Sequence, residues 1–567
     1  MRGAASVSSA LTRCHWPRSV AHRSRQPLIN QRPVRGKDTT ATASCARGGF
    51  SACAASLNWK PCPGPSQFGA MEAGCKRDSV GKRVQASNAF SGKAGITDEA
   101  LMQEYANQGS GAVSSSGGNE AHSFQIPGLK VIDHSFEVPL DHFDAADDTT
   151  IKIFVREVSS FTKSYRALPF LLYLQGGPGF EANRPTEASG WLKSACNLFR
   201  VILLDQRGTG RSTPITCANL KQQGDAAAQA RYLTHFRADS IVADCEVVRQ
   251  KLVPQGNQGG KWSIIGQSFG GFCCTTYLSF APYALTEVLM TGGVPPLVTS
   301  VNGAEEVYLC TFRRVVTQNE KYYQRFPSDA PIIHRIVKHL AAQPDGGVLL
   351  PSGSLLTPRY LQTIGLSGLG GGGGFERMHY LFESAWDGDE LSYSFLKNCD
   401  NWGAWDTNPL YCLLHEIIYC NGPGAASGWA AQRVRDSAEY AERFDAVAAA
   451  EAGAPVMFTG EMVFPWMMDD IAALRPYKEA ANLLAESTAW SALYDVAMLE
   501  NNAVPVACAV YFEDMYVDFN LSQQTLSKVN GARQWISNEF MHSGIRDDGA
   551  RIFEVLLNLV RGAVPLR

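Results

Sequence analysis

The sequence predicts an α/β protein whose mostly parallel sheet is interrupted by a large helical insertion. Short apolar runs that end in glycine turns recur between residues 168 and 290, with helical patterns between them, which is typical of buried parallel strands. A long stretch with few strand signals follows, from about residue 298 to 500. Strand-like patterns then return near residue 504, so the sheet is expected to resume after the insertion.

The expected elements follow the chain in order. Two segments, 131–140 and 150–158, alternate apolar and polar residues, as paired and half-exposed strands do. Continuous apolar runs predict four buried strands, at 168–174, 199–204, 262–265 and 285–290. Counted with the two alternating segments, the strand at 285–290 is the sixth, and the insertion is expected to follow it. Helical patterns lie between and after them at 230–252, 271–283 and 549–561. The remaining expected strands are a short candidate at 454–458 and two that complete the sheet, at 504–512 and 533–538.

These patterns divide the chain into four parts. The 567 residues, 45% of them hydrophobic and 19% charged, are enough for one large domain with an inserted one. Residues 1–120 are rich in Gly, Ser and Ala and are expected to lie outside the core. The sheet domain is expected at 125–297 and again at 501–567, with a helical cap domain at 298–500 between its two halves.

Charge is unevenly distributed along the chain. Residues 1–37 contain seven Arg, one Lys and no acid, so this segment carries +8, and the net charge of −3 leaves −11 for the rest. A composition rich in Arg and Ser, poor in acids and without a long apolar run is typical of an organellar transit peptide. We therefore expect delivery to a plastid or mitochondrion. A cytoplasmic protein whose N-terminal tail carries no address is the alternative.

Composition also argues against several classes of function. A net charge of −3 gives no global basic field for nucleic acid, and no run of about 18 apolar residues predicts a membrane helix. The 15 Cys form no CxxC pair, and 415–419 (HEIIY) begins like the zinc motif HExxH but has Tyr419 in place of the second His. The run Gly368–Gly374 contains GxGxxG but follows no expected strand, so it is expected to be a flexible loop. No metal and no cofactor are expected.

Residues 266–270 (GQSFG) form the only GxSxG motif of the chain. An expected buried strand precedes this motif and a helical pattern follows it, which is the context of a nucleophile elbow in the α/β-hydrolase fold. Ser268 is therefore the candidate nucleophile. An acyl-transfer site also needs hydrogen-bond donors for the developing oxyanion. The candidates are the backbone N–H of Phe269 and that of Gly177, which lies in the glycine-rich loop after the strand at 168–174.

A serine nucleophile needs a general base, and in this fold the chain order is Ser, acid, His. Four of the five His after Ser268 lie in the insertion, and only His542 follows the last expected strand. Three acids follow the strand before it. Asp514 is preferred because it lies 28 residues before His542 and can reach its Nδ1 across one loop, with Glu513 as the runner-up and Asp518 further along.

Several motifs together resemble those of the proline iminopeptidases, a serine peptidase family with the α/β-hydrolase fold. The motifs occur in the family's order over about residues 125–567: LQGGPGF (174–180), LLDQRGTGRS (203–212), GQSFGGF (266–272), FERMHYLFE (375–383), NPLYCLLHEIIYCNG (408–422), TGEMVFPWM (459–467) and EDMYV (513–517). The resemblance implies a triad of Ser268, Asp514 and His542 that releases N-terminal proline from peptides through an acyl-enzyme. One departure is Gln175, since many members carry His at this position. The glycine run in the insertion is also longer than usual.

The resemblance also points to acids of the insertion as partners for the ammonium group of the substrate. A buried carboxylate can distinguish a free N-terminus from a blocked one, because the blocked one would leave its charge unpaired. Glu416 and Glu461 are the candidates, since aromatic and aliphatic residues flank both in the sequence. The candidate walls of a pocket for the proline ring are Phe269, Tyr419, Phe464 and Trp466.

Two other functions stay open from the sequence. One is a related carboxylesterase or amidase with broader acyl specificity. The other belongs to a different class, a hydrolase-fold binding protein that has lost turnover, although the presence of Ser268, Asp514 and His542 argues against it.

Overall fold

The computed structural model of the protein describes residues 122–161, 167–298 and 300–563. The N-terminal extension expected at 1–120, with its transit-peptide composition, lies outside these residues. Within the described ranges, nine strands form one sheet: β1 (Ser123–Ile126), β2 (Leu129–Pro139), β3 (Thr150–Ser159), β4 (Phe170–Leu174), β5 (Arg200–Leu204), β6 (Trp262–Gln267), β7 (Leu285–Thr291), β12 (Val506–Tyr511) and β13 (Ala532–Ser537).

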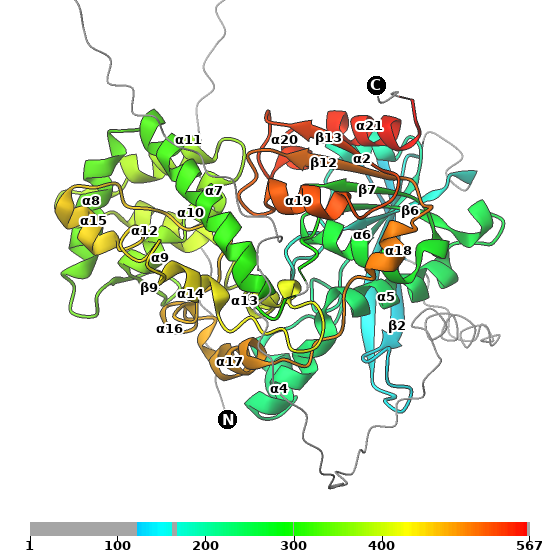
Figure 1. The fold of residues 1–567 in the computed structure, drawn as a ribbon, viewed down its shortest axis with the longest axis horizontal. Coiled ribbons are helices and arrows are strands. Elements are labelled where there is room, and N and C mark those ends of the chain that lie inside the picture. The colour runs from blue at the N-terminus through cyan, green and yellow to red at the C-terminus, as the bar shows by residue number, and fades with distance from the viewer. Residues whose placement is uncertain (1–121, 162–166, 299, 564–567) are drawn as a thin grey trace, which may run out of the picture. The chain divides into compact units, whose positions relative to one another are not determined.

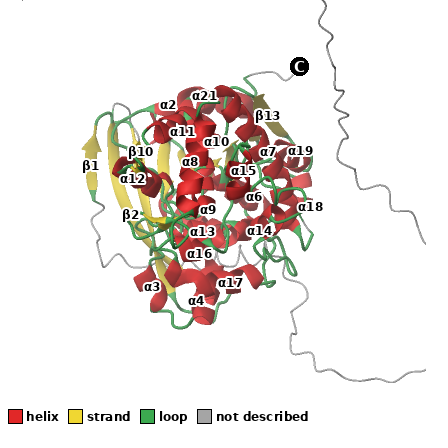
Figure 2. Ribbon diagram, turned by 90° about the vertical axis from the view of Figure 1, so that its left-hand side faces the viewer, coloured by secondary structure: helices red, strands yellow, loops and turns green. Residues whose placement is uncertain are grey.

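The sheet is mostly parallel, as predicted. Its order is β1-β2-β3-β5-β4-β6-β7-β12-β13, and Figure 2 shows β1 and β2 at one edge and β13 at the other. The pairings from β1 to β5 are antiparallel, whereas all those from β5 to β13 are parallel. The carboxyl ends of the parallel strands therefore meet at one edge of the sheet, where α/β proteins place their sites.

One strand differs from the expectation. The short strand β1 forms a hairpin with β2 through a turn in which Gly128 has a φ of +81°. Its four residues (SFQI) carry too short an alternation to distinguish a strand from a loop. Because of this additional strand, the helical insertion follows the seventh strand of the structure and not the sixth.

Helices cover both faces of the sheet. Alternate residues of a strand point to opposite faces, so Leu171 and Tyr173 of β4 pack with α2 and α21, while Phe170 and Leu172 belong to the larger core on the other face, with α5 and α6. The helix expected at 230–252 is two helices, α4 and α5, separated by a 3₁₀ turn. The helices of the sheet domain are α2 (Gly190–Ala195), α3 (Cys217–Lys221), α4 (Ala226–Leu233), α5 (Ala238–Leu252), α6 (Phe269–Phe280), α19 (Phe519–Leu526), α20 (Gly544–Asp547) and α21 (Gly549–Val560).

Most of the chain between β7 and β12 is helical, as predicted, and Figure 1 shows many of these helices to the left of the sheet. Two small hairpins interrupt them, β8–β9 (Val348–Leu349 with Leu355–Leu356) and β10–β11 (Trp386–Asp387 with Glu390–Leu391). The helices are α7 (Gly303–Arg325), α8 (Asp329–Ala341), α9 (Pro358–Gln362), α10 (Gly365–Leu369), α11 (Gly374–Glu383), α12 (Tyr393–Trp402), α13 (Pro409–Leu414), α14 (Ala430–Arg435), α15 (Ala446–Ala452), α16 (Met467–Asp470), α17 (Lys478–Glu486) and α18 (Val496–Glu500). We call this segment the cap.

The short strand expected at 454–458 does not form. Its backbone instead bonds to side chains of the cap: Asn319 of α7 exchanges hydrogen bonds with Phe458, and the Tyr323 hydroxyl donates to the Val456 carbonyl at 2.7 Å. A buried backbone needs partners, and here side chains supply what a neighbouring strand would. The apolar pattern was therefore a sign of burial and not of a strand.

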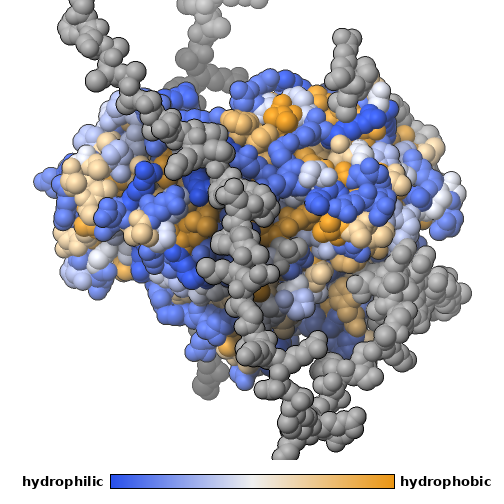
Figure 3. Space-filling view, viewed as in Figure 1, coloured by the Kyte–Doolittle hydropathy of each residue, from blue (hydrophilic) through white to orange (hydrophobic). Residues whose placement is uncertain are grey.

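Polar and apolar residues are interspersed on the face drawn in Figure 3. In the part of the chain that the structure describes, no helix has both the length and the apolar composition needed to cross a bilayer.

Candidate active site

Ser268 occupies a strained turn between β6 and α6. Its φ of 56° and ψ of −126° lie in a region that residues with a side chain rarely adopt. The turn is tight, because a Cβ on Gly270 would lie only 1.9 Å from the Leu174 carbonyl oxygen. The neighbouring strand and the helix together hold this conformation. It brings Ser268 to the wall of a cavity at the carboxyl end of the parallel strands.

His542 and Asp514 meet at the same edge of the sheet, although they follow different strands. The Nδ1 atom of His542 lies 2.8 Å from Oδ2 of Asp514, and both side chains are buried. The other carboxylate oxygen, Oδ1, accepts hydrogen bonds from the backbone N–H groups of Tyr516 (2.8 Å) and Val517 (3.0 Å), which fixes the carboxylate plane. With Nδ1 donating to Asp514, Nε2 carries the lone pair, and the amide nitrogen of Gln267 lies 3.4 Å from it. His542 and Ser268 line the same cavity.

The two other candidate acids point elsewhere. Glu513 lies within hydrogen-bond or ion-pair distance of Lys321 and Gln318 of the cap. Asp518 accepts hydrogen bonds from two backbone N–H groups at the start of α19 and pairs with Arg314 at 3.0 Å. Asp514 is therefore the one of the three that contacts His542.

At 370–373, the glycine run of the insertion forms a turn that packs against the His542 loop. Its residues end α10 and begin α11. The carbonyl of Gly370 accepts a hydrogen bond from the His542 N–H at 3.2 Å, and a Cβ on Gly370 would lie 2.1 Å from the Tyr516 hydroxyl oxygen. The Tyr516 ring stands edge-on to the imidazole, with centroids 4.6 Å apart. A run without side chains lets the cap approach this closely.

The loop after β4 lies directly beside Ser268. Gly176 and Gly177 line the cavity, and a Cβ on Gly176 would be 2.9 Å from the Cβ of Ser268. Phe269 is the first residue of α6, where backbone N–H groups lack partners within the helix. The backbone N–H groups of Gly177 and Phe269 stay the candidate oxyanion donors. Gln175, which stands where many members carry His, receives a hydrogen bond from the Tyr173 hydroxyl at 2.9 Å.

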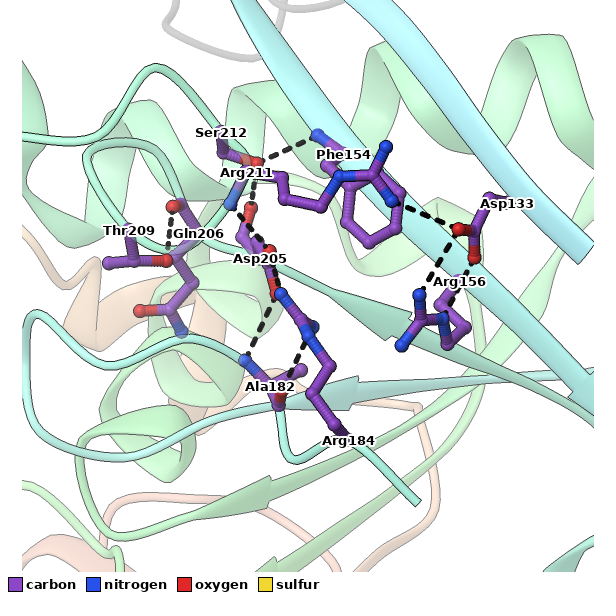
Figure 4. A network of polar contacts seen from close by, with 10 residues as sticks. All are labelled: Asp133, Phe154, Arg156, Ala182, Arg184, Asp205, Gln206, Thr209, Arg211 and Ser212. Carbon is purple, nitrogen blue, oxygen red and sulfur yellow. Dashed lines mark hydrogen bonds and ion pairs between the residues drawn. The ribbon is translucent and has the colours of Figure 1, made fainter. Parts of the chain in front are cut away.

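Side chains at the carboxyl end of β5 hold this loop at two points, and Figure 4 shows the one at Asp205. Gln206 donates from Nε2 to the Gln175 carbonyl at 2.9 Å. The buried Asp205 carboxylate accepts from the Ala182 N–H at 3.2 Å and forms a bidentate pair with Arg184, at 2.7 and 2.5 Å. The DQRGTGRS motif thus fixes the segment that carries Gly177, a contribution that the sequence alone did not reveal.

The cavity has a volume of about 360 Å³ and an aromatic wall. Of the residues described by the structure, Glu461 is the only carboxylate that lines it. Besides the residues described above, its lining includes Phe180, Leu366, Ser367, Asn401, Trp402, Gly403, Ala404, Trp405, Tyr411 and Arg546.

Glu461 is held in place by two neighbours from the cap. The Tyr411 hydroxyl donates to its Oε1 at 3.0 Å, and Nε2 of the buried His415 lies 3.5 Å from its Oε2. Burial raises the pKa of the Glu461 carboxyl, but the imidazoles of His415 and His542 and the hydrogen bond from Tyr411 outweigh burial, so the pKa lies below its usual value. A carboxylate that stays ionised and is 15% exposed to the cavity can bind a cation.

The structure places Glu416 away from the cavity, contrary to the expectation that it meets the substrate. It begins a 3₁₀ turn (Glu416–Tyr419), and its two oxygens accept from the backbone N–H groups of Ala430 (3.1 Å) and Ala431 (2.8 Å) at the start of α14. Burial raises its pKa to about 7, and the two backbone hydrogen bonds only partly oppose this. Glu416 therefore caps a helix of the insertion.

The aromatic residues chosen from the sequence are buried, but none of them lines the cavity. Phe464 and Trp466 stack on each other with centroids 5.5 Å apart, Phe269 contacts Phe272, and Tyr419 packs between Phe272 and Tyr308. The aromatic residues that do line it sit in motifs already noted, or next to them. They are Phe180, Trp402, Trp405, Tyr411 and Tyr516. The sequence neighbours of Ser268, Glu416 and Glu461 therefore do not form the aromatic wall.

Among the residues that the structure describes, no group of three or more His, Cys, Asp or Glu side chains is arranged to hold a metal ion. His415, from the motif that begins like HExxH, instead contacts Glu461 and the Tyr308 hydroxyl (3.1 Å).

The fold and the strained serine turn place the chain in the class of α/β hydrolases, and the family model for the alpha/beta hydrolase fold matches residues 169–330. The chain is 48% identical over 438 residues to a proline iminopeptidase of Aeromonas sobria, covering 77% of this chain and 98% of that protein. It is 38% identical over 432 residues to a proline iminopeptidase of Aspergillus aculeatus, covering 75% and 92%. The chain therefore belongs to the proline iminopeptidase family. The solved structure of a proline iminopeptidase from Mycobacterium smegmatis is 13% identical, with a TM-score of 0.36 over 76% of this chain and 100% of that one.

Proposed function

We propose that this protein is a serine aminopeptidase that releases N-terminal proline from peptides through an acyl-enzyme. One observation carries the proposal. A single cavity brings together a serine on a strained turn, a histidine bonded to a buried aspartate, a glycine loop and one ionised carboxylate. The names of the Aeromonas and Aspergillus relatives point to the same substrate.

In the proposed mechanism, Nε2 of His542 takes the proton from Ser268 Oγ as that oxygen bonds to the carbonyl carbon of the N-terminal proline. The carbonyl oxygen gains the negative charge and accepts hydrogen bonds from the N–H groups of Gly177 and Phe269. His542 then gives its proton to the leaving nitrogen, and the C–N bond breaks. Water, deprotonated by His542, attacks the ester in the same way and releases proline. Asp514 orients the imidazole and stabilises its charged form.

Glu461 supplies the selection for a free N-terminus. The ring nitrogen of an N-terminal proline is a secondary ammonium group, which can pair with the carboxylate. An acylated proline is neutral there and would cover the carboxylate without pairing with it, so the desolvation cost would not be offset by a new contact. The aromatic wall offers flat apolar surface to the proline ring.

The test is a substrate panel read as kcat/KM: chromogenic amides of proline, alanine, leucine and N-acetylproline, with a simple activated ester. We expect the proline amide to be preferred, the N-acetyl compound to be poor, and Ser268→Ala to lower kcat on the proline amide by roughly 10³-fold or more. Ser279→Ala is the matched control, because Ser279 lies in α6 and bonds only to the Thr275 carbonyl (2.9 Å). Efficient turnover of the ester without turnover of the proline amide would favour the esterase function and refute the proposal.

A further inference from the structure

The cavity carries a positive group as well as Glu461. Arg546 lies in α20, four residues after His542, and lines the same cavity. Arg546 is exposed, whereas Ser268 and His542 are buried, so Arg546 lies at the open end of the cavity. A small pocket thus presents an anion, a nucleophile and a cation to one ligand.

The guanidinium of Arg546 is not used by the fold. Within the described ranges, its side chain makes no hydrogen bond or ion pair, whereas Arg551 and Arg561 nearby pair with Glu539 and Glu287. The adjacent carboxylate of Asp547 accepts a hydrogen bond from the Ser543 hydroxyl at 2.5 Å. An arginine that makes no structural contact and faces a cavity can bind an anion of the ligand.

Tyr516 lines the cavity together with Glu461 and Arg546, and its ring contacts His542. Burial raises the pKa of its phenol; the Glu461 and Asp514 carboxylates raise it further, and Arg546 lowers it. Both cavity charges therefore act on a ring that stands edge-on to His542. Glu461 and Arg546 nevertheless form no ion pair with each other, so each can serve a separate end of a bound molecule.

We propose that Arg546 binds the C-terminal carboxylate of a short peptide, so that the preferred substrates are di- or tripeptides with both ends free. This inference rests on the proposed function, because it assumes that Glu461 binds the ammonium end. A zwitterionic short peptide matches the two charges, and a cavity of about 360 Å³ is small for a longer chain. The carboxylate of a longer peptide would lie outside the pocket and gain nothing from Arg546.

The experiment compares each peptide with its C-terminal amide, using Pro-Ala and Pro-Ala-Ala at low ionic strength. The readout is the ratio of kcat/KM for the acid to kcat/KM for the amide, measured in wild type, Arg546→Gln, Arg546→Lys and the control Arg551→Gln. We expect a wild-type ratio of about 3 to 10 for at least one length, as for a charge-assisted contact that is partly open to water. The ratio should fall to about 1 in Arg546→Gln, hold an intermediate value in Arg546→Lys, and stay at the wild-type value in Arg551→Gln.

Each outcome has one meaning. A wild-type ratio near 1 at both lengths, or a preference for the acid that persists in Arg546→Gln, would overturn the inference. If the wild type fails to hydrolyse the proline chromogenic amide, which has no carboxylate, then the proposed function fails and not the role of Arg546. Because every comparison is a ratio within one variant, a general loss of stability does not imitate the expected result.

Discussion

Glu461→Gln separates amine recognition from catalysis more sharply than any other change in the cavity. The substitution keeps the shape of the side chain and an oxygen that can accept from the Tyr411 hydroxyl, but it removes the negative charge. Ser268, His542 and the loop after β4 are untouched. A substrate whose N-terminus is an ammonium should therefore lose its partner, while a neutral substrate should not.

The size of the loss follows from the surroundings of Glu461. Its side chain is 15% exposed, so the contact with an ammonium is largely but not fully removed from water. Two charges 4 Å apart attract by about 4 kcal/mol at the effective dielectric constant of 20 that suits such sites. Truncating one partner of a desolvated pair costs about 2–5 kcal/mol. We expect about 2–4 kcal/mol for this site, which is roughly a 30- to 900-fold loss in kcat/KM.

The assay measures kcat/KM for a proline chromogenic amide with a free amine and for a neutral activated ester, in wild type and two variants. Glu461→Gln should lose roughly 30- to 900-fold on the amide and less than about threefold on the ester. Glu416→Gln is the matched control, since it makes the same exchange at a buried position that contacts α14 and not the cavity. It should affect both substrates equally. Circular dichroism and thermal melting show that each variant is folded.

Two results would refute this reasoning. Equal losses on the amide and the ester in Glu461→Gln would mean that Glu461 supports the cap and does not meet the amine. A loss on the amide but not on the ester in Glu416→Gln would mean that Glu416, and not Glu461, binds the amine.

Three further predictions concern positioning, pH and the N-terminus. Gln206→Ala should lower kcat about tenfold with little change in KM, because it frees the segment that carries Gly177 from β5. Gln206→Glu should not restore kcat, because an ionised carboxylate cannot donate to a carbonyl. An unchanged kcat in Gln206→Ala would contradict this prediction. Glu416 has a raised pKa of about 7 in the fold against 4.5 when unfolded, so the free energy of unfolding of the wild type should fall by at most about 3 kcal/mol as pH rises from about 4.5 to 7. Glu416→Gln should lack this fall in thermal melts. Parallel curves of stability against pH for the two proteins would contradict the prediction. Deleting residues 1–120 should leave kcat/KM on the proline amide nearly unchanged, since the residues that line the cavity lie between 175 and 546. A fluorescent fusion of 1–120 should enter a plastid or mitochondrion. A uniform cytosolic signal would contradict the proposed localisation.

The sequence by itself determined the features that depend on local patterns. The mostly parallel sheet and the helical insertion follow from apolar runs bounded by glycine, because burial on both faces leaves such runs in the sequence. The position of Ser268 follows in the same way, since a strand–turn–helix elbow is a local structure. The preference for Asp514 and His542 followed from chain order in the fold, and the structure brings these two side chains to 2.8 Å.

Only the tertiary structure decided which cap residues face the cavity. Glu416 and Glu461 look alike in the sequence, yet one bonds to the backbone at the start of α14 and the other meets Tyr411 and His415 in the cavity wall. The aromatic lining comes from five places along the chain, between residues 180 and 516, and no local pattern records that they converge. The direction of a side chain in an irregular cap depends on packing between segments that are distant in sequence, and such contacts have no period from which to predict them.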